Sequence, residues 1–475
     1  MSNVLDLVDQ TAFLGERATK ATNLLQVVWV YNRAIDIDGL RDFHRHLQQG
    51  RLSRRIERSP LPFGRHRWVS PSDQPELEIA ATRPRGEFDA WVDEQANTPL
   101  DPEHGPGWHL AVLPFTDGGA GVSFVTSHCL IDGVGLCEAL ADAASGRRDP
   151  INWPAAGSRR RWRALREDAR QTVRDIPSMG RAVAAAARFA RRNRVGESAT
   201  QPPTAPRSPF VGPDEHVAPP MATIFVDADE WDARAHALGG TSNALLAGLA
   251  ALLAQRAGRV TAEGFATLAL PVNERSPGDT RANAITAVDV TVDPAAATTD
   301  LRNIRAALKQ ALIRRQEIPD ERWALLPLSP LLPQWLIRRM AGVALGGATT
   351  SGSSNLGALN PAANRPDGTD ADHFVIKGSN SGVTKAIMHR TGGIMALLSG
   401  RSDRQVFVSV LAYQPDRTSS NDTLRKDLSS ALSDFSLTAT IGWPRPEPVS
   451  GAPVATTREQ VDAIADQLDS SSCTA

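Results

Sequence analysis

The chain has 475 residues, of which 41% are hydrophobic and 22% charged, so it can bury a sizeable core and is not a disordered chain. Its 52 basic and 53 acidic residues leave a formal net charge of −1, which excludes a global attraction to nucleic acid or other polyanions. Three cysteines are too few for a disulfide framework, and no metal-ligand spacing, signal-like N-terminus or apolar run of about 18 residues is present. We therefore expect a cytoplasmic protein without metal or cofactor.

The first half alternates strand and helix patterns. Residues 24–38 predict a β-branched strand, and residues 39–49 follow with apolar side chains at helical spacing. Residues 50–70 indicate a loop or short strands, and 86–97 a short helix. The turn residues Asp117-Gly118-Gly119 separate two alternating runs and predict a β-hairpin, after which helical spacing resumes.

The second half begins after the clearest linker, which is rich in proline, serine and glycine. Before this linker, residues 158–195 are arginine-rich and helical in pattern, with an interruption expected at Pro177. After it come a strand and a helix, and then a long apolar helix capped by Thr241. Residues 300–345 are largely helical. Four later runs alternate like strands before a final helix over 422–437: 373–379, 385–391, 394–400 and 405–412.

These patterns divide the chain into two subdomains, a linker and a tail. The expected N-terminal subdomain spans 1–195, the linker 196–220 and the C-terminal subdomain 221–445. A polar tail, 446–475, follows.

One segment has the composition of a catalytic loop: Ser127-His128-Cys129-Leu130-Ile131-Asp132-Gly133. A histidine closes a predicted strand, where its ring can project into a cleft, and histidine is the side chain best suited to proton transfer near neutral pH. Asp132 can stiffen the following turn, and Gly133 permits a tight backbone there. Taken alone, the HxxxDG pattern is short, and a hydrogen-bonded loop histidine fits it as well.

The surroundings of this loop decide between the two interpretations, because they resemble the CoA-dependent acyltransferase superfamily. That superfamily includes condensation domains, polyketide-associated acyltransferases, wax ester synthase/diacylglycerol acyltransferases and chloramphenicol acetyltransferase, which are similar in carrying HHxxxDG at a strand end. Four further segments resemble family motifs in family order: Pro99-Leu100 with Gly105-Pro106-Gly107-Trp108, 239–246, Pro271-Val272-Asn273-Glu274-Arg275 with Asn283, and Ser354-Asn355-Leu356-Gly357.

The resemblance implies two chloramphenicol-acetyltransferase-like α/β subdomains that form a pseudo-dimer around a central channel. His128 then corresponds to the catalytic second histidine of the motif and acts as general base. Asp132 pairs with Arg275, and Gly133 completes this structural part of the active site. Ser127, Ser354 and Asn355 are expected to line the substrate channel.

The same resemblance implies the reaction, an acyl transfer from an acyl-CoA or carrier-protein thioester to an alcohol on a lipid or small molecule. The wax ester synthase/diacylglycerol acyltransferase branch fits best, and a condensation or polyketide-associated acyltransferase with a carrier-protein donor is the alternative. A catalytically silent binding module is a third hypothesis, because the first motif histidine is Ser127 here and the family's Asn-Asp pair is Asn243-Ala244. A serine hydrolase is disfavoured because no GxSxG elbow is present, and Cys129 is interpreted as a packing residue.

Charge is unevenly distributed along the neutral chain. Residues 158–195 contain 12 arginines and three acids, a local net charge of +9. A solvated helix face is one interpretation of this segment. The other is contact with an anionic membrane, a lipid substrate or CoA phosphates, which favours a peripheral position at the inner membrane surface.

Overall fold

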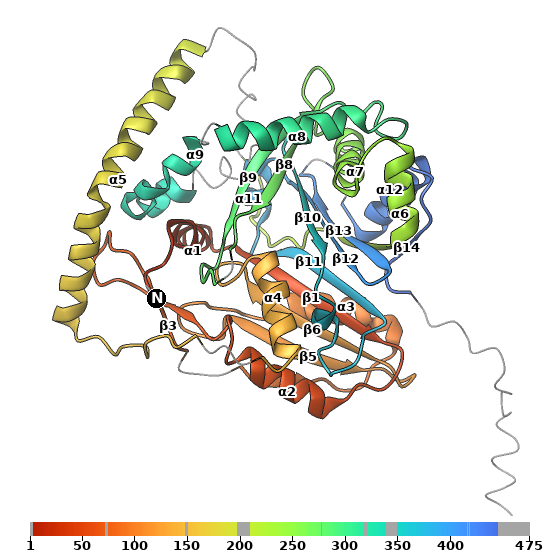
Figure 1. The fold of residues 1–475 in the computed structure, drawn as a ribbon, viewed down its shortest axis with the longest axis horizontal. Helices are drawn as coiled ribbons and strands as arrows, with labels where there is room; N and C mark the ends of the chain where they lie inside the picture. The colour runs from red at the N-terminus through yellow and green to blue at the C-terminus, as the bar shows by residue number, and fades with distance from the viewer. Residues whose placement is uncertain are drawn as a thin grey trace, which may run out of the picture. The chain divides into compact units, whose positions relative to one another are not determined.

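Two β-sheets organise the protein (Figure 1). The computed structural model describes residues 3–444, apart from 72–74, 148–150, 197–209, 277, 318–320, 339–348, 416 and 418. The first sheet is built mainly from the first half of the chain and the second from the second half.

The first sheet has five strands in the order β11-β1-β6-β5-β4. All neighbours are antiparallel except β4 and β5. The strands are β1 (Thr22–Tyr31), β4 (Leu77–Ile79), β5 (Trp108–Pro114), β6 (Ala120–Ser127) and β11 (His373–Ser381). β1 is buried on both faces from Leu24 to Tyr31, which explains its continuous apolar sequence. β5 and β6 form the hairpin that the Asp117-Gly118-Gly119 turn predicts.

The second sheet has seven strands in the order β14-β7-β13-β12-β10-β8-β9. β10 runs parallel to β8 and β12, and the other pairs are antiparallel. The strands are β7 (Met221–Asp227), β8 (Ala266–Asn273), β9 (Ile285–Val292), β10 (Ser351–Ala358), β12 (Ile394–Ser402), β13 (Gln405–Tyr413) and β14 (Ala439–Ile441). β2 (Arg55–Glu57) and β3 (Arg67–Val69) form a separate small pair.

Helices pack against both sheets. In the first half they are α1 (Leu7–Thr19), α2 (Ile37–Leu47), η1 (Arg85–Glu87), α3 (Phe88–Ala96), α4 (Gly133–Ala144) and α5 (Arg161–Gly196). In the second half they are α6 (Ala228–Ala237), α7 (Ser242–Arg256), α8 (Arg302–Glu317), α9 (Glu321–Ala324), η2 (Leu326–Leu331), η3 (Pro361–Asn364), α11 (Lys385–Thr391) and α12 (Asn421–Asp434). α7 is apolar on nearly every side because it is buried in the core of the second half.

The two halves share strands and core residues. β11 comes from the second half, yet it pairs with β1 over nine residues, from Thr22 opposite Ser381 to Val30 opposite His373. Phe225 and Phe407 of the second sheet are buried in the core of the first. The segment after β6 also contacts the loop between β8 and β9, where Asp132 N donates to Ala282 O at 3.0 Å.

The structure corrects two local predictions. α5 continues through Pro177 instead of being interrupted there, because residue 173, whose carbonyl loses its helical partner, is exposed to solvent. Residues 385–391 form α11 rather than a strand. Thr384 caps this helix by accepting from Ile387 N, and Gly392 ends it with a left-handed φ of 78°.

Parts of the predicted linker and tail cannot be compared with the structure. Residues 197–209 and 446–475 lie outside the described residues. Within the described part, no single helix is long and apolar enough to cross a membrane. α6 and α7 reach that length and composition only as a pair, with an 82° bend between them.

Candidate active site

The motif loop connects the end of β6 to the start of α4. His128 N donates to Asn23 O at 2.9 Å, which ties the loop to the start of β1. The carbonyl oxygen of His128 accepts from Asn283 Nδ2 at 3.0 Å, so the second half of the chain holds the same residue from the other side. The His128 side chain is half-buried, and its ring nitrogens have no hydrogen-bond partner among the described residues. Its backbone is therefore held from both halves of the chain.

Asp132 and Arg275, the predicted pair, are in contact at the end of this loop. Arg275 Nη2 lies 2.7 Å from Asp132 Oδ2, and the two side chains are only 2% and 1% exposed. Asp132 also accepts from Gly135 N at 2.7 Å, which caps α4, and from Ala284 N at 2.8 Å. Two of these contacts hold backbone amides and the third is the Arg275 side chain, and none of them reaches the His128 imidazole.

Two glycines allow this close packing. A methyl group on Gly135 would come within 2.9 Å of Arg275 Nη2, and one on Gly133 within 2.9 Å of Leu356 Cδ2. Leu356 follows Asn355 on β10, so the SNLG segment of the second half reaches the first turn of α4.

A second buried carboxylate, Asp9 of α1, was missed by the sequence analysis. Its Oδ2 accepts from Ala282 N at 3.1 Å, and its Oδ1 accepts from Asn283 N at 2.8 Å and from Asn283 Nδ2 at 3.2 Å. Burial raises the pKa of Asp9 to about 6, although nearby Arg54 and the Asn283 hydrogen bonds oppose this shift. Asp9 and Asp132 together clamp residues 282–284 against the His128 loop.

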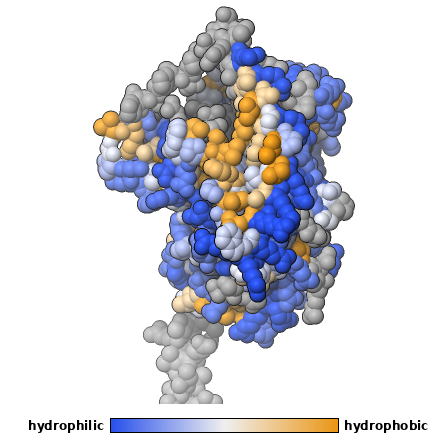
Figure 2. Space-filling view, turned by 90° about the vertical axis from the view of Figure 1, so that its left-hand side faces the viewer, coloured by the Kyte–Doolittle hydropathy of each residue, from blue (hydrophilic) through white to orange (hydrophobic). Residues whose placement is uncertain are grey.

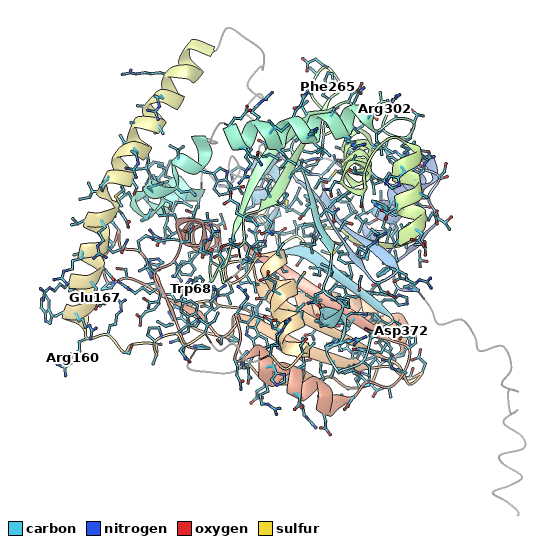
Figure 3. All side chains as sticks on the ribbon, viewed as in Figure 1. Trp68, Arg160, Glu167, Phe265, Arg302 and Asp372 are labelled. Carbon is cyan, nitrogen blue, oxygen red and sulfur yellow. The ribbon has the colours of Figure 1, made fainter. Side chains whose placement is uncertain are left out.

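Arg54 completes this clamp from the side of β2. It donates to the carbonyl oxygens of Leu130 at 2.5 Å and Thr280 at 2.6 Å, and its guanidinium stacks 4.5 Å from the ring centre of Trp68. Burial lowers the pKa of Arg54 to about 10, and the charge of Asp9 opposes this effect. Figure 3 labels Trp68 in the region between α5 and the centre of the molecule.

Ser127 is fully buried, and its hydroxyl contacts protein groups. It donates to Glu16 Oε2 at 3.4 Å and accepts from Cys129 N at 3.2 Å. Glu16 Oε1 also accepts from Asn23 N at 3.2 Å. Glu16 thus contacts the residues that flank His128 and the residue that holds its amide. Burial raises the pKa of Glu16 to about 7, against hydrogen bonds from Cys129, Asn23 and Ser127.

Cys129 is fully buried, and burial raises the pKa of its thiol far above its usual range. A buried neutral thiol is a poor nucleophile, which agrees with its interpretation as a packing residue.

Ser354 and Asn355 are consecutive on β10, so their side chains lie on opposite faces of the sheet. Asn355 Nδ2 donates to Asn243 Oδ1 at 2.6 Å, which brings two family-like segments together at the start of α7. Asn355 lines a cavity there, and its neighbour Ser353, rather than Ser354, shares that wall.

The sequence signal for α1 was present. Asp6 is a typical N-cap residue, and its side chain accepts from Val8 N. Asp9 and Phe13 are both buried and lie four residues apart, which is helical spacing. Glu16 lies in the same helix, three residues after Phe13. The sequence of α1 mixes polar and apolar residues. A search for apolar residues at helical spacing therefore does not detect Asp9 and Glu16, although both carboxylates are turned toward the protein interior.

Glu16 makes stability depend on pH. Because its pKa is raised from 4.5 in the unfolded chain to about 7 in the fold, the folded state retains a proton that the unfolded state releases. The free energy of unfolding should therefore fall as pH rises from about 5 to 7. Relative to wild type, Glu16→Gln should gain stability over that window, with a slope approaching ~1.4 kcal/mol per pH unit in urea titrations.

The matched control for this titration is Glu167→Gln on α5. Hydrogen bonding to Arg163 lowers the pKa of Glu167, so this carboxylate is already ionised throughout the window. Its stability difference from wild type should not change between pH 5 and 7. If the stability difference between Glu16→Gln and wild type is also constant between pH 5 and 7, Glu16 does not titrate in that range.

Part of the chain is similar to a known family, and most of it is similar to solved structures. The family model "Wax ester synthase/diacylglycerol acyltransferase catalytic domain" matches residues 40–246. Among solved structures, the first condensation domain of the calcium-dependent antibiotic synthetase, in complex with a substrate analogue, has 13% identity and a TM-score of 0.53 and covers 92% of this chain and 94% of its own. No curated protein matches the sequence.

Two further structures have the same architecture. The wax ester synthase/diacylglycerol acyltransferase from Marinobacter aquaeolei VT8 has 16% identity and a TM-score of 0.51, with coverage of 92% of this chain and 98% of its own. Polyketide synthase associated protein 5 from Mycobacterium tuberculosis has 16% identity and a TM-score of 0.50, with 89% and 97% covered.

These likenesses confirm the fold class, an α/β pseudo-dimer of two chloramphenicol-acetyltransferase-like halves, and the resemblance to the CoA-dependent acyltransferase superfamily. Residues 40–246 are similar to an acyltransferase catalytic domain.

Proposed function

We propose that this protein transfers an acyl group from an acyl-CoA to an alcohol, with His128 as the general base. The proposal rests on two features of His128, its fixed backbone and its ring, which is unpartnered in the described part of the chain. Its backbone is held from both halves of the chain, while its half-buried imidazole has no partner among the described residues. A ring held in this way is available to a substrate proton, whereas a structural histidine uses its nitrogens within the protein.

In the proposed reaction, His128 first accepts a proton and later returns it. One nitrogen of the His128 ring takes the proton of the acceptor hydroxyl as its oxygen attacks the thioester carbonyl. The carbon–sulfur bond breaks, and the imidazolium returns the proton to the departing thiolate. The products are an ester and free CoA. This scheme requires no metal and no covalent acyl-enzyme, and its acceleration comes from positioning the two substrates beside one base.

Release of free thiol tests this function. The purified protein is incubated with short- and long-chain acyl-CoAs and with long-chain alcohols, diacylglycerol or amines as acceptors. We expect thiol release that depends on an alcohol. Release with amines alone would favour amide formation, as in a condensation domain. Release only from an acyl-carrier protein would favour the carrier-protein alternative. No turnover with any pair would leave a silent binding module.

A second proposal concerns α5, which we infer to dock on an anionic membrane. Four apolar side chains on this helix are at least half exposed, and spacings of 11, 3 and 7 residues place them near one face: Trp162, Val173, Ile176 and Val183. Exposed arginines form a neighbouring stripe at spacings of 4, 4 and 7: Arg166, Arg170, Arg174 and Arg181. Figure 2 faces the α5 side and shows a hydrophobic band bordered by hydrophilic side chains. Such adjacent stripes are typical of helices that lie in a membrane interface.

The structure also shows which arginines are unsuitable for testing this docking. Arg159 contacts Glu57 and Asp168, so it stabilises the attachment of α5. Arg160 and Glu167, labelled in Figure 3, mark the lower end of the helix. The four arginines of the exposed stripe have no acidic partner among the described residues, and replacing them leaves the fold contacts intact.

We predict that the wild type sediments with phosphatidylglycerol vesicles, detaches as salt rises and ignores neutral vesicles. Changing Arg166, Arg170, Arg174 and Arg181 to Gln should weaken binding at least about tenfold, because each arginine near an anionic surface contributes on the order of 1 kcal/mol at low salt. The control has four exposed cations elsewhere changed to Gln: Arg41, Arg45, Arg404 and Lys426. Equal loss in both variants would mean that net charge, rather than α5, drives binding.

A further inference from the structure

A cavity of about 360 Å³ lies between α7, α8, β8 and β10 in the second half. One wall is apolar and includes Leu246, Leu270 and Leu308. Leu312 and Ile313 of α8 extend this wall, and both are more than 40% exposed although they are large hydrophobic residues. The volume is within the range of about 300–1,000 Å³ that is usual for small-molecule sites.

The opposite wall is polar. It includes Thr241, Asn243, Ser353 and Asn355, and Asn243 and Asn355 are hydrogen-bonded to each other. Asn355 is followed by Leu356, which lies against Gly133 beside the motif loop. The polar wall therefore leads toward the segment that carries His128.

Two cations on one side of α8, Arg305 and Lys309, line the same cavity one helical turn apart. Both are exposed, and neither has an acidic partner among the described residues. No aspartate or glutamate lines this cavity, whereas each of four other surface cavities of the described chain has at least one. The cavity thus combines an apolar wall, neutral hydrogen-bonding groups and uncompensated positive charge.

We propose that this cavity binds the phosphopantetheine arm of the acyl-CoA donor, with Arg305 and Lys309 at the CoA phosphates. The arm has an aliphatic part that fits the leucine wall and two amides that fit the asparagine, serine and threonine side chains. Its negative charge matches the two free cations. The thioester end would then lie toward Asn355 and the His128 loop. This inference rests on the proposed function, because it assigns a place to the donor of that reaction.

Direct binding of CoA to the full-length protein tests the cavity separately from catalysis. By isothermal titration calorimetry at low salt, Arg305→Gln/Lys309→Gln should bind CoA at least about tenfold more weakly than wild type, which is ~1.4 kcal/mol. The charge-preserving Arg305→Lys/Lys309→Arg should stay within about threefold of wild type. Pantetheine, which has no phosphate, should bind the wild type and the Gln variant equally.

Two further variants complete the experiment. Arg314→Gln changes an exposed cation of α8 that does not line the cavity, and it should bind CoA like the wild type. Figure 3 labels Arg302 at the N-terminal end of this helix, and Arg314 lies near the other end. Leu312→Asp places a carboxylate in the apolar wall and should weaken CoA binding, while its exposed position preserves the melting temperature.

The results separate the cavity from the reaction. Equal CoA affinity in the wild type and the Gln variant, or no CoA binding by the wild type, overturns the cavity assignment. Loss of binding in the Gln variant without thiol release by the wild type supports the cavity and removes the proposed reaction. Thiol release with an unchanged KM for acyl-CoA in the Gln variant keeps the reaction and removes the cavity.

Discussion

His128→Ala should lower the rate of acyl transfer at least about a hundredfold, because general base catalysis contributes roughly 10²–10⁴ in rate. Its melting temperature should stay close to that of the wild type, since the half-buried ring has no hydrogen bond to the described part of the protein. The measurement is kcat/KM from thiol release, together with thermal unfolding monitored by circular dichroism.

A control separates this loss from a general effect of removing a histidine. His104 is 68% exposed in its side chain and contacts Asp101 and Glu103 on the surface, so His104→Ala should keep full activity. If His128→Ala retains more than about a tenth of wild-type activity, a loss below ~1.4 kcal/mol, His128 is not the base.

Asp132→Ala and Arg275→Ala should each destabilise the protein by about 3–5 kcal/mol, because each leaves the other charge buried without its partner. The double variant should cost less than the sum, since the uncompensated charge is then absent. Urea denaturation of the four proteins gives the coupling free energy. Additivity within roughly 0.3–0.5 kcal/mol would mean that the pair does not act as a unit.

An exposed pair gives the scale for this coupling. Arg163 and Glu167 are four residues apart on α5, with an Nε–Oε1 distance of 2.9 Å and side chains that are 75% and 30% exposed. A double-mutant cycle on this pair should give a coupling free energy of only about 0.3–0.5 kcal/mol, because solvent screens the charges. Comparison of the two coupling free energies shows how burial changes the strength of an arginine–carboxylate ion pair.

Local sequence patterns predicted most of the sheet strands because a buried strand leaves a strong signal. β1, β5 and β6 have continuous or alternating apolar residues and a glycine turn, and all three form as expected. The alternation in 385–391 was misleading, because seven residues are too few to distinguish the period of a strand from that of a helix. The helix caps at Thr384 and Gly392 decided the outcome.

Part of the site depends on tertiary contacts that no local pattern encodes. Asp132 and Arg275 are 143 residues apart, and their pairing was inferred only through the family resemblance. Asp9 is 274 residues from Asn283. Nothing near Asp9 in the sequence indicates that its carboxylate holds a loop beside His128, because two of its three hydrogen bonds come from backbone amides, which no residue type marks.

The exchange of β11 has a consequence for how the chain reaches its native state. β1 can complete its pairing only after residues 373–381 have been synthesised, because β11 forms the outer strand of its sheet. Until then β1 is an unprotected edge with apolar side chains on both faces, which is the kind of edge that recruits other chains. Contacts of such long sequence separation slow folding. Expression of residues 1–195 alone should therefore give an aggregation-prone fragment, and we expect ribosome-bound intermediates of the full chain to depend on chaperones during synthesis of the second half.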